Sequence, residues 1–274
     1  MSRLSYFCKR LVKMDWATMW KTTDLLKERS GKSRPWLMCD MLHCAVKYNA
    51  GYVDYKIAQM YRLNEKQRAT VITRGISNNI VRRMNDKAYW HFFDDKTQFK
   101  RLLLEKNIGI LEEIVVQHPD MAKLCPTSVN TCRIATLLGD KKQGIVYAFL
   151  RIGNGKVMDN VDCGGMAARI DLESGKLLTV GADKQGNTYE KHPMTGTPIV
   201  GFTIPYWEEA KAMCLEAAQV VPQMRFVAWD VAITPNGPTF IEGNSFPSHA
   251  VPQFAAHYPD GIGILPEFEK FIDL

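Results

Sequence analysis

The segment Val227–Asn244, VAWDVAITPNGPTFIEGN, has the pattern of a β-hairpin. Apolar and β-branched residues fill both arms, and Pro235-Asn236-Gly237 supplies the residue types that chain reversals favour. Because successive side chains of a strand point to opposite faces, Asp230 lies on the face opposite to Trp229. The first arm therefore has an acid in the middle of an otherwise apolar strand.

The length of the turn determines where the second arm places its own acid. A three-residue loop, Pro235-Asn236-Gly237, pairs Thr234 with Pro238 and sets Asp230 directly opposite Glu242. A two-residue loop would put the two acids on opposite faces, since a shift of one residue turns every side chain to the other side. We expect the loop with an odd number of residues.

On the returning arm, Phe240, Glu242 and Asn244 are expected to share one face. Two carboxylates and a carboxamide oxygen then meet at one point, and Mg²⁺ prefers such oxygen ligands beside waters and phosphate oxygens. This favours a metal-triphosphate site at Asp230, Glu242 and Asn244. In the alternative interpretation the acids are separately solvated, but acids between apolar residues need a partner, a metal or a sheet edge.

The hairpin is part of a longer β-rich region that begins after Phe99, in which short β-forming runs alternate with Gly, Pro, Asn and Asp. One helix interrupts these runs from Tyr206 to about Val221, with Pro205 at its entrance. Residues 91–274 are therefore expected to form an α+β domain with a largely antiparallel sheet. The other expected strands are Ile110–Val116, Arg133–Leu138 and Gly144–Ile152, with hairpin strands at Val227–Ile233 and Thr239–Ile241.

Residues 1–90 have helical periodicity instead, and we expect a mainly helical N-terminal domain there. Its first helix is amphipathic, with a stripe formed by Leu4, Phe7, Leu11 and Met14 that we expect to pack on the body of the protein. Ser30–Ser33 and Pro35 end this first helical pattern. Further helices are expected at Trp36–Ala50, Tyr52–Met60, Glu65–Ile76 and Asn78–Asn85.

The composition is that of a globular protein, with 46% hydrophobic and 23% charged residues in a chain of 274. No apolar run reaches the roughly 18 residues that a membrane span requires, and the N-terminus lacks the apolar core of a secretory signal. A cytoplasmic protein without a transmembrane segment is expected. The seven cysteines form no C-x-x-C pair, so we expect reduced thiols rather than zinc ligands or disulfides.

The net charge of +6 is concentrated at the N-terminus, because residues 1–34 contain nine Lys/Arg and three Asp/Glu. This basic end could attract an anionic partner, although a solvated helix face is the more common explanation. The sequence shows no basic surface interleaved with aromatic residues, so no nucleic-acid role is expected.

The hairpin acids with Asn244, followed by Ser245-Phe246-Pro247, resemble the C-terminal signature of the ATP-grasp superfamily. Other segments narrow this resemblance to the sugar-transfer associated ATP-grasp group, which is related to alpha-L-glutamate ligases. These segments are Glu112–Pro119 (EEIVVQHP), Ser128–Arg133 (SVNTCR), Asp159-Asn160 with Gly164-Gly165, and Trp229–Ile233 (WDVAI). The resemblance covers residues 90–274 and, more loosely, the helical front.

The resemblance implies ATP and Mg²⁺ as cofactors and an ATP-dependent carboxylate-amine ligase that works through an acyl phosphate. Its substrates would be a small carboxylate and an amine, an amino acid or amino sugar, in a setting such as polysaccharide or cell-envelope sugar modification. Arg133, Asp230 and Glu242 would be catalytic, and Asp230, Glu242 and Asn244 would hold the metal. The alternative is a catalytically degenerate ATP-grasp protein that serves as a binding module.

The resemblance also implies a set of nucleotide-binding residues. The segment from Leu111 would form the hinge strand along the adenine edge, and the two arginines would clamp phosphates. Each position also has a simpler interpretation, namely a solvated acid, a salt bridge, a turn or a surface ion pair. The implied residues are Lys96, Glu112, Glu113, Ile114, Arg133, Arg151, Asn160, Gly164 and Gly165.

Two further expectations concern what covers the site. His192 lies in a Gly/Pro/Thr-rich loop that could reach the acceptor or phosphate, although an exposed loop histidine is the more common outcome. In the family, a subdomain with a phosphate-binding lysine and a glycine-rich lid separates the positions matched by Lys96 and Glu112. Only Thr97–Leu111 lies between them here, which fits one helix, so this lid is expected to be missing or strongly shortened.

Overall fold

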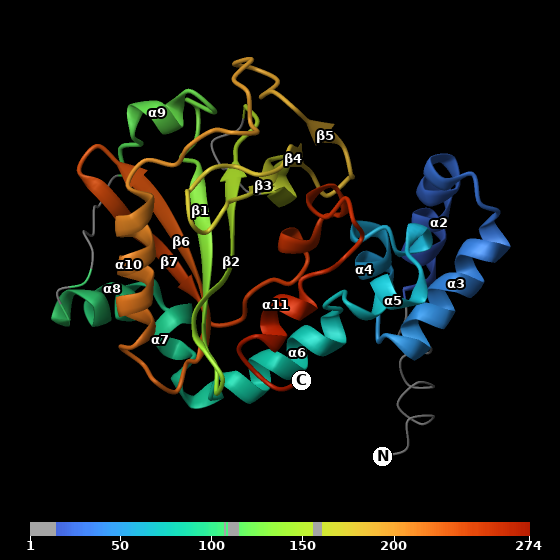
Figure 1. Cartoon of the computed structure of the whole chain (residues 1–274), viewed down its shortest axis with the longest axis horizontal. Helices are drawn as coiled ribbons and strands as arrows, with labels where there is room; N and C mark the ends of the chain where they lie inside the picture. The colour runs from blue at the N-terminus through green and yellow to red at the C-terminus, as the bar shows by residue number, and fades with distance from the viewer. Residues whose placement is uncertain (1–14, 107, 109–114, 156–160) are drawn as a thin grey trace.

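The computed structural model describes residues 15–106, 108, 115–155 and 161–274 (Figure 1). It begins with helices α2 (Trp16–Ser30) and α3 (Arg34–Lys47), whose limits are set by local caps. Asp15 caps α2, and Gly31 ends it in the left-handed conformation with φ 68°. Ser33 caps α3. The stripe that the sequence predicts for the first helix lies outside the described residues.

The helical front continues with α4 (Tyr52–Ile57), η1 (Met60–Arg62), α5 (Glu65–Ala69) and α6 (Arg74–Met84). The prediction of one helix over Glu65–Ile76 is wrong, because the chain leaves the helix after Ala69 and re-enters one at Arg74. In this break, the Ile72 amide donates to Gln253 Oε1 (2.8 Å) and the Ile72 carbonyl accepts from Gln253 Nε2 (2.8 Å). The backbone groups are thus satisfied by a distant side chain instead of by helix bonds.

The front helices have an apolar core of their own, which includes Leu37, Tyr55 and Met60. A buried polar group lies at its edge. Arg68 donates to both carboxylate oxygens of Asp40 at 2.8 Å, and the Tyr55 hydroxyl donates to the same carboxylate at 2.6 Å. This paired arrangement satisfies charges that would otherwise be costly to bury.

Short helices lead from the front to the sheet. They are η2 (Lys87–Tyr89), α7 (His91–Asp94), α8 (Lys96–Glu105) and α9 (Pro119–Ala122). Helical structure therefore continues past residue 90, so the domain boundary placed there stays a prediction. Residues 110–114 of the predicted strand Ile110–Val116 lie outside the described residues, and its last two residues belong to no strand.

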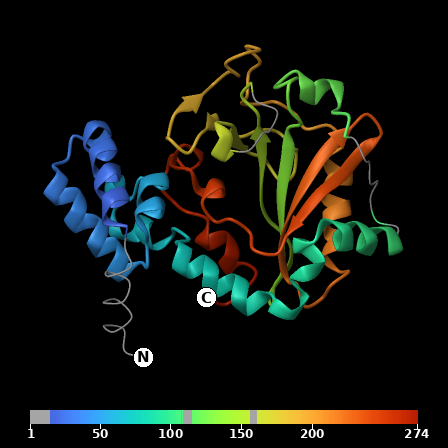
Figure 2. The same ribbon diagram turned by 180° about the vertical axis from the view of Figure 1, so that it is seen from behind.

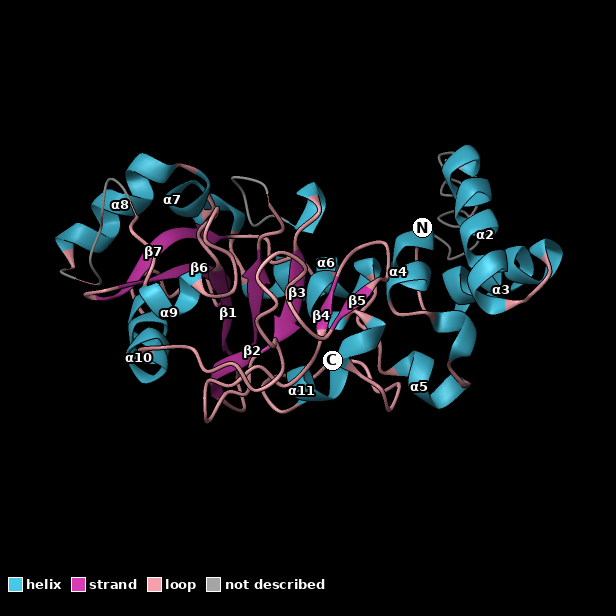
Figure 3. Ribbon diagram, turned by 90° about the horizontal axis from the view of Figure 1, so that it is seen from above, coloured by secondary structure: helices cyan, strands magenta, loops and turns pink. Residues whose placement is uncertain are grey.

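The second half forms a seven-stranded, fully antiparallel sheet, as the α+β prediction required. The strands lie in the order β5-β4-β3-β2-β1-β6-β7, with β5 nearest the helical front and β7 farthest from it (Figure 3). Strands β3 to β5 were not predicted. The bounds are β1 (Thr131–Leu138), β2 (Gln143–Ile152), β3 (Met166–Arg169), β4 (Gly181–Ala182), β5 (Thr188–Tyr189), β6 (Phe226–Thr234) and β7 (Gly237–Asn244).

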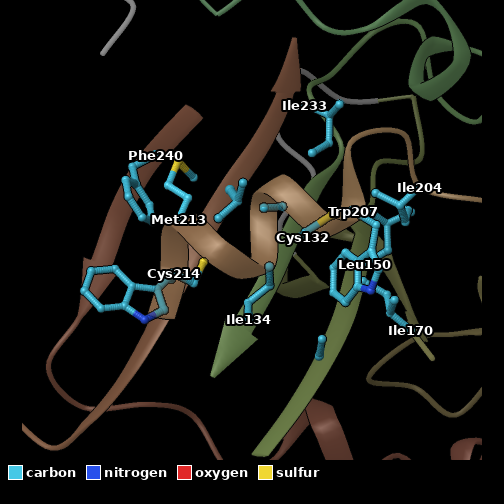
Figure 4. Packing of buried hydrophobic residues seen from close by; sticks show 14 of the residues in the cluster. Cys132, Ile134, Leu150, Ile170, Ile204, Trp207, Met213, Cys214, Ile233 and Phe240 are labelled. Carbon is cyan, nitrogen blue, oxygen red and sulfur yellow. The ribbon is translucent and has the colours of Figure 1, made fainter. Parts of the chain in front are cut away.

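One face of the sheet is covered by helix α10 (Trp207–Ala218), close to the predicted bounds. Its Met213 and Cys214 belong to one apolar cluster with Ile134 of β1 and Phe240 of β7 (Figure 4). The other face packs on α6 and on α11 (Leu265–Glu269). The sheet is thus the middle layer between helices, as expected when both of its faces are apolar over most of their length.

The C-terminal segment, with η4 (Val251–Gln253), η5 (Ala255–His257) and α11, runs between the front helices and the sheet (Figure 2). His249 Nε2 lies 2.7 Å from Asp54 Oδ1, which adds a second link beside the Gln253 contact. Within the described residues, none of the helices combines the length and the apolar character that crossing a membrane requires.

Candidate functional site

The turn of the β6–β7 hairpin has two residues, Pro235 and Asn236, because Thr234 pairs with Gly237. The Thr234 hydroxyl donates to the Gly237 carbonyl (2.9 Å), and Gly237 has φ 119°, which side-chain-bearing residues rarely adopt. The predicted three-residue loop is therefore wrong. By the argument from alternation alone, this turn would have separated the two hairpin acids.

A β-bulge restores the alignment that the turn would have lost. Val231 pairs with Phe240, yet the next residue, Asp230, pairs with Glu242, so Ile241 is the surplus residue. The predicted pairing of Asp230 with Glu242 is confirmed, although by a different device. The prediction that Phe240 shares the face of Glu242 is wrong. Phe240 packs in the core on the α10 side.

Asp230 is almost fully buried and is held by two arginines. Arg133, its cross-strand partner on β1, donates from Nε to Oδ1 (2.5 Å) and from Nη2 to Oδ2 (2.5 Å). Arg151 on β2 donates from Nη1 to Oδ2 (2.8 Å). Both guanidinium groups are thereby fixed over one face of the sheet, where they could meet phosphate oxygens.

Glu242 lies beside this pair and is about one-third exposed. Its Oε1 is 3.8 Å from Arg133 Nη2. Burial, together with a hydrogen bond and charge repulsion from Asp230, raises the pKa of Glu242 above its usual range, while Arg133 and Lys96 act in the other direction. Asn244 completes the row on the same face and donates to the Ala228 carbonyl at 3.2 Å.

The donor set resembles a site for a hard cation that is shared with a ligand. Among the described residues, no group of three or more His, Cys, Asp or Glu side chains gathers, so a metal here would have two carboxylates and the Asn244 amide as protein ligands. Mg²⁺ commonly accepts few protein ligands and completes its octahedron with water and phosphate oxygens. The raised pKa of Glu242 beside Asp230 also fits, since a cation would relieve the repulsion between the two carboxylates.

A model of the sugar-transfer associated ATP-grasp proteins matches residues 105–262, more than half of the chain. This chain belongs to the sugar-transfer associated ATP-grasp family. The resemblance predicted from the sequence is thus confirmed, and the match includes the hairpin with both arginines. A search of the curated proteins finds no match.

Lys96, a further predicted nucleotide residue, precedes the matched residues and lies near the hairpin acids. Lys96 is exposed at the start of α8, and its charge acts on Glu242. Its neighbour Asp95 caps the helix by accepting from the Thr97 amide (2.8 Å), which is a structural role that the Asp-x-x-Gln spacing could have revealed. The resemblance gave no prediction for this cap.

Gly164 and Gly165 lie just before β3, whose Ala167 pairs with Arg151. Gly164 has φ 95° and open space where a Cβ would be, so its backbone is accessible on that side. Its role toward phosphate stays a prediction. Glu112, Glu113, Ile114 and Asn160 lie outside the described residues, and their predicted roles stay predictions too.

His192 is 1% exposed, so the interpretation as an exposed loop histidine is wrong. Its Nε2 lies 2.8 Å from the Gly153 carbonyl at the end of β2. On the same residue, the Gly153 amide donates to Asn130 Oδ1 (3.2 Å), and Asn130 Nδ2 donates to Gln117 Oε1 (2.8 Å). This buried network fixes the loop against the sheet.

Sequence reasoning missed two side chains of the same sheet face. Tyr147 and Arg169 both align with the arginine row, because Arg169 pairs with Phe149, two residues from each of Tyr147 and Arg151. Arg169 lies over the Tyr258 ring, 4.5 Å from its centroid, and donates to the His257 carbonyl (3.4 Å). The period-2 spacing of Tyr147, Phe149 and Arg151 could have indicated this face.

Proposed function

We propose that this ATP-grasp protein is an ATP- and Mg²⁺-dependent carboxylate-amine ligase of the glutamate-ligase type. A substrate carboxylate oxygen attacks the γ-phosphorus of ATP, and the bond to the leaving ADP breaks. The substrate amine then attacks the acyl carbon of the resulting acyl phosphate, phosphate leaves, and the surplus amine proton passes to solvent. The acid and amine are small molecules, an amino acid or amino sugar, in polysaccharide or cell-envelope sugar modification.

The observation that carries this proposal is a cluster of charged side chains on one face of four neighbouring strands, β2, β1, β6 and β7. The cluster consists of Arg151, Arg133, Asp230 and Glu242. Asp230 holds both guanidinium groups in place through charge-assisted hydrogen bonds. Donors fixed before the substrate arrives stabilise charge on a transferring phosphoryl group without reorganisation at the moment of reaction. The arrangement needs no side-chain nucleophile.

The carboxylates of Asp230 and Glu242 and the amide of Asn244 would hold Mg²⁺. When bound, the ion supplies positive charge that neutralises triphosphate oxygens and orients them. Arg133 and Arg151 bind the same phosphates from the side of β1 and β2. Burial of Asp230 keeps water from competing for these contacts.

One observation favours the alternative, a binding module without catalysis. Asp230 already accepts three hydrogen bonds from Arg133 and Arg151. A carboxylate that is neutralised in this way has less negative charge for a metal than a solvated one. In that case, nucleotide or another anion would bind to the arginines without a requirement for Mg²⁺.

The test compares ATP binding with and without Mg²⁺ by ligand-observed NMR. In the proposed function, Mg²⁺ strengthens ATP binding by the wild type, and Glu242→Gln weakens Mg-ATP binding about tenfold, equivalent to ~1.4 kcal/mol. The matched control is Glu269→Gln, an exposed acid on α11, which should bind like the wild type. ATP binding that does not depend on Mg²⁺, or that is unchanged in Glu242→Gln, contradicts the metal site.

A screen for ADP release against amino acids and amino sugars then separates the ligase from the binding module. The ligase releases ADP only when both the acid and the amine are present, because the acyl phosphate needs an acceptor to turn over. A chain that binds Mg-ATP but releases no ADP with any pair supports the binding module.

A further inference from the structure

A cavity of about 530 Å³ lies between the front helices and the β4–β5 turn. We call it the basic cavity. Its walls come from α2, α4 and η1 on one side, and from the β4–β5 turn and the segment Phe254–Ala256 on the other. A volume of this order is typical of small-molecule sites. The charged residues that line it are Arg29, Lys56, Arg62, Asp183 and Lys184.

Four of these five residues are basic, so the lining has a formal excess of three positive charges. Like charges that line one hollow repel each other more strongly when they are partly removed from water. Lys56 shows this effect, because burial and the charges of Arg29 and Lys184 lower its pKa, while Asp183 acts in the other direction. An anion in the cavity would relieve the repulsion.

The acid of the cavity already has a structural role. Asp183 Oδ1 accepts from the Asn187 amide (2.8 Å), and Oδ2 accepts from Asn187 Nδ2 (2.8 Å) and from the Tyr189 hydroxyl (3.0 Å). These bonds close the β4–β5 turn. Because this carboxylate is engaged in the turn, it is a poor counter-ion for several cations at once.

The basic cavity adjoins the sheet face that carries the arginines of the candidate site. Ala182, which lines the cavity, pairs with Ala167 of β3, and Ala167 pairs with Arg151. Directly paired residues point to the same face, and neighbouring strands are about 4.8 Å apart, so the step from Arg151 to Ala182 is about 10 Å. The basic cavity therefore lies on the same sheet as the arginines, with the buried Ala167 between Ala182 and Arg151.

We propose that the basic cavity binds the phosphoryl group of a phosphorylated small-molecule substrate. The phosphoryl group is favoured over a monoanionic carboxylate because a dianion matches the excess positive charge more closely. The anion site stands on the cavity itself, whereas its assignment to a substrate rests on the proposed function.

The experiment measures the thermal stability of the full chain with inorganic phosphate at constant ionic strength. Phosphate should raise the melting temperature of the wild type, since a ligand that binds the folded state stabilises it. Lys56→Gln should reduce this shift by at least half. It should also melt no lower than the wild type without phosphate, because it removes a charge from a repulsive group. Lys184→Gln on the turn is a second variant with the same expected loss of shift.

The matched control is Lys66→Gln, which removes an exposed lysine of α5 outside the cavity and should keep the full phosphate shift. Acetate, a monoanionic carboxylate, should give a smaller shift than phosphate at the same ionic strength. The inference is overturned if phosphate gives the wild type no shift, if both cavity variants keep the full shift, or if acetate matches phosphate.

The outcome is separable from that of the proposed function. If the chain does not bind Mg-ATP but its phosphate shift depends on Lys56, the anion site is supported and the proposed ligase function is contradicted. If ATP binding depends on Mg²⁺ but neither cavity variant changes the phosphate shift, the ligase function is supported and the anion site is contradicted.

Discussion

Asp230 accepts hydrogen bonds from two guanidinium groups while its own side chain is 2% exposed. A buried carboxylate in such a position is needed by the fold as much as by any ligand, since its loss would remove the acid that both Arg133 and Arg151 contact. The residue therefore couples the chemistry of the site to the stability of the sheet. Functional tests at this position would confuse the two effects.

At the residue scale, we expect Asp230→Asn to lower the free energy of unfolding by about 3–5 kcal/mol, because it removes the buried charge that pairs with two arginines. The measurement is urea denaturation followed by tryptophan fluorescence. Glu242→Gln serves as the comparison and should cost no more than about 1 kcal/mol, since Glu242 is more exposed and has weaker contacts. Equal losses in the two variants would contradict the structural role of Asp230.

The sequence was sufficient to single out the two acids but not the partners that hold them. An acid between Trp229 and Val231 breaks an apolar pattern, and such a break is visible locally. The ion pair of Asp230 with Arg133 joins residues 97 positions apart, and it depends on the pairing of β1 with β6. Local periodicity contains no information on which strands become neighbours.

At the element scale, the β6–β7 hairpin combines two irregularities that compensate for each other. Its two-residue turn shifts the alternation by one position, and the bulge at Ile241 shifts it back. Both arms are apolar around this point, so no residue type marks Ile241 as surplus. The sequence therefore predicted the right pair of acids from the wrong turn.

We expect deletion of Ile241 to be tolerated, with a loss in unfolding free energy below about 1.5 kcal/mol. A regular ladder then pairs Val231 with Phe240 and Asp230 with Glu242, as before. Deletion of Thr239 is the matched control, because it turns Phe240 out of the core and should cost about 3 kcal/mol or more. Urea denaturation measures both losses in unfolding free energy. Equal losses from the two deletions would contradict the bulge at Ile241.

At the scale of the whole molecule, the helical front and the antiparallel sheet could both be predicted from periodicity. Strands β4 and β5 could not, because two-residue strands have no measurable period. The break between α5 and α6 also escaped prediction. It depends on Gln253, which lies 181 residues from Ile72 in the chain. The side chain of Gln253 binds the Ile72 backbone groups, which would otherwise form helix hydrogen bonds.

The predicted shortening of the lid can be tested on the 274-residue chain. Over its described residues, the segment after Lys96 is one helix, α8, and a missing lid would remove cations and walls from above the site. We therefore expect Mg-ATP to bind weakly, with a Kd of roughly 0.1 mM or weaker. Calorimetry that shows low-micromolar binding would contradict the prediction, and ADP release should be correspondingly slow.

The clamp formed by Gln253 on Ile72 also affects how the protein is made. A ribosome releases the front helices long before it has synthesised Gln253, 181 residues later, or His249, 195 residues after Asp54. Until then, the peptide groups between α5 and α6 lack their native partners. The junction between α5 and α6 can therefore complete its native contacts only after the C-terminal segment has left the ribosome.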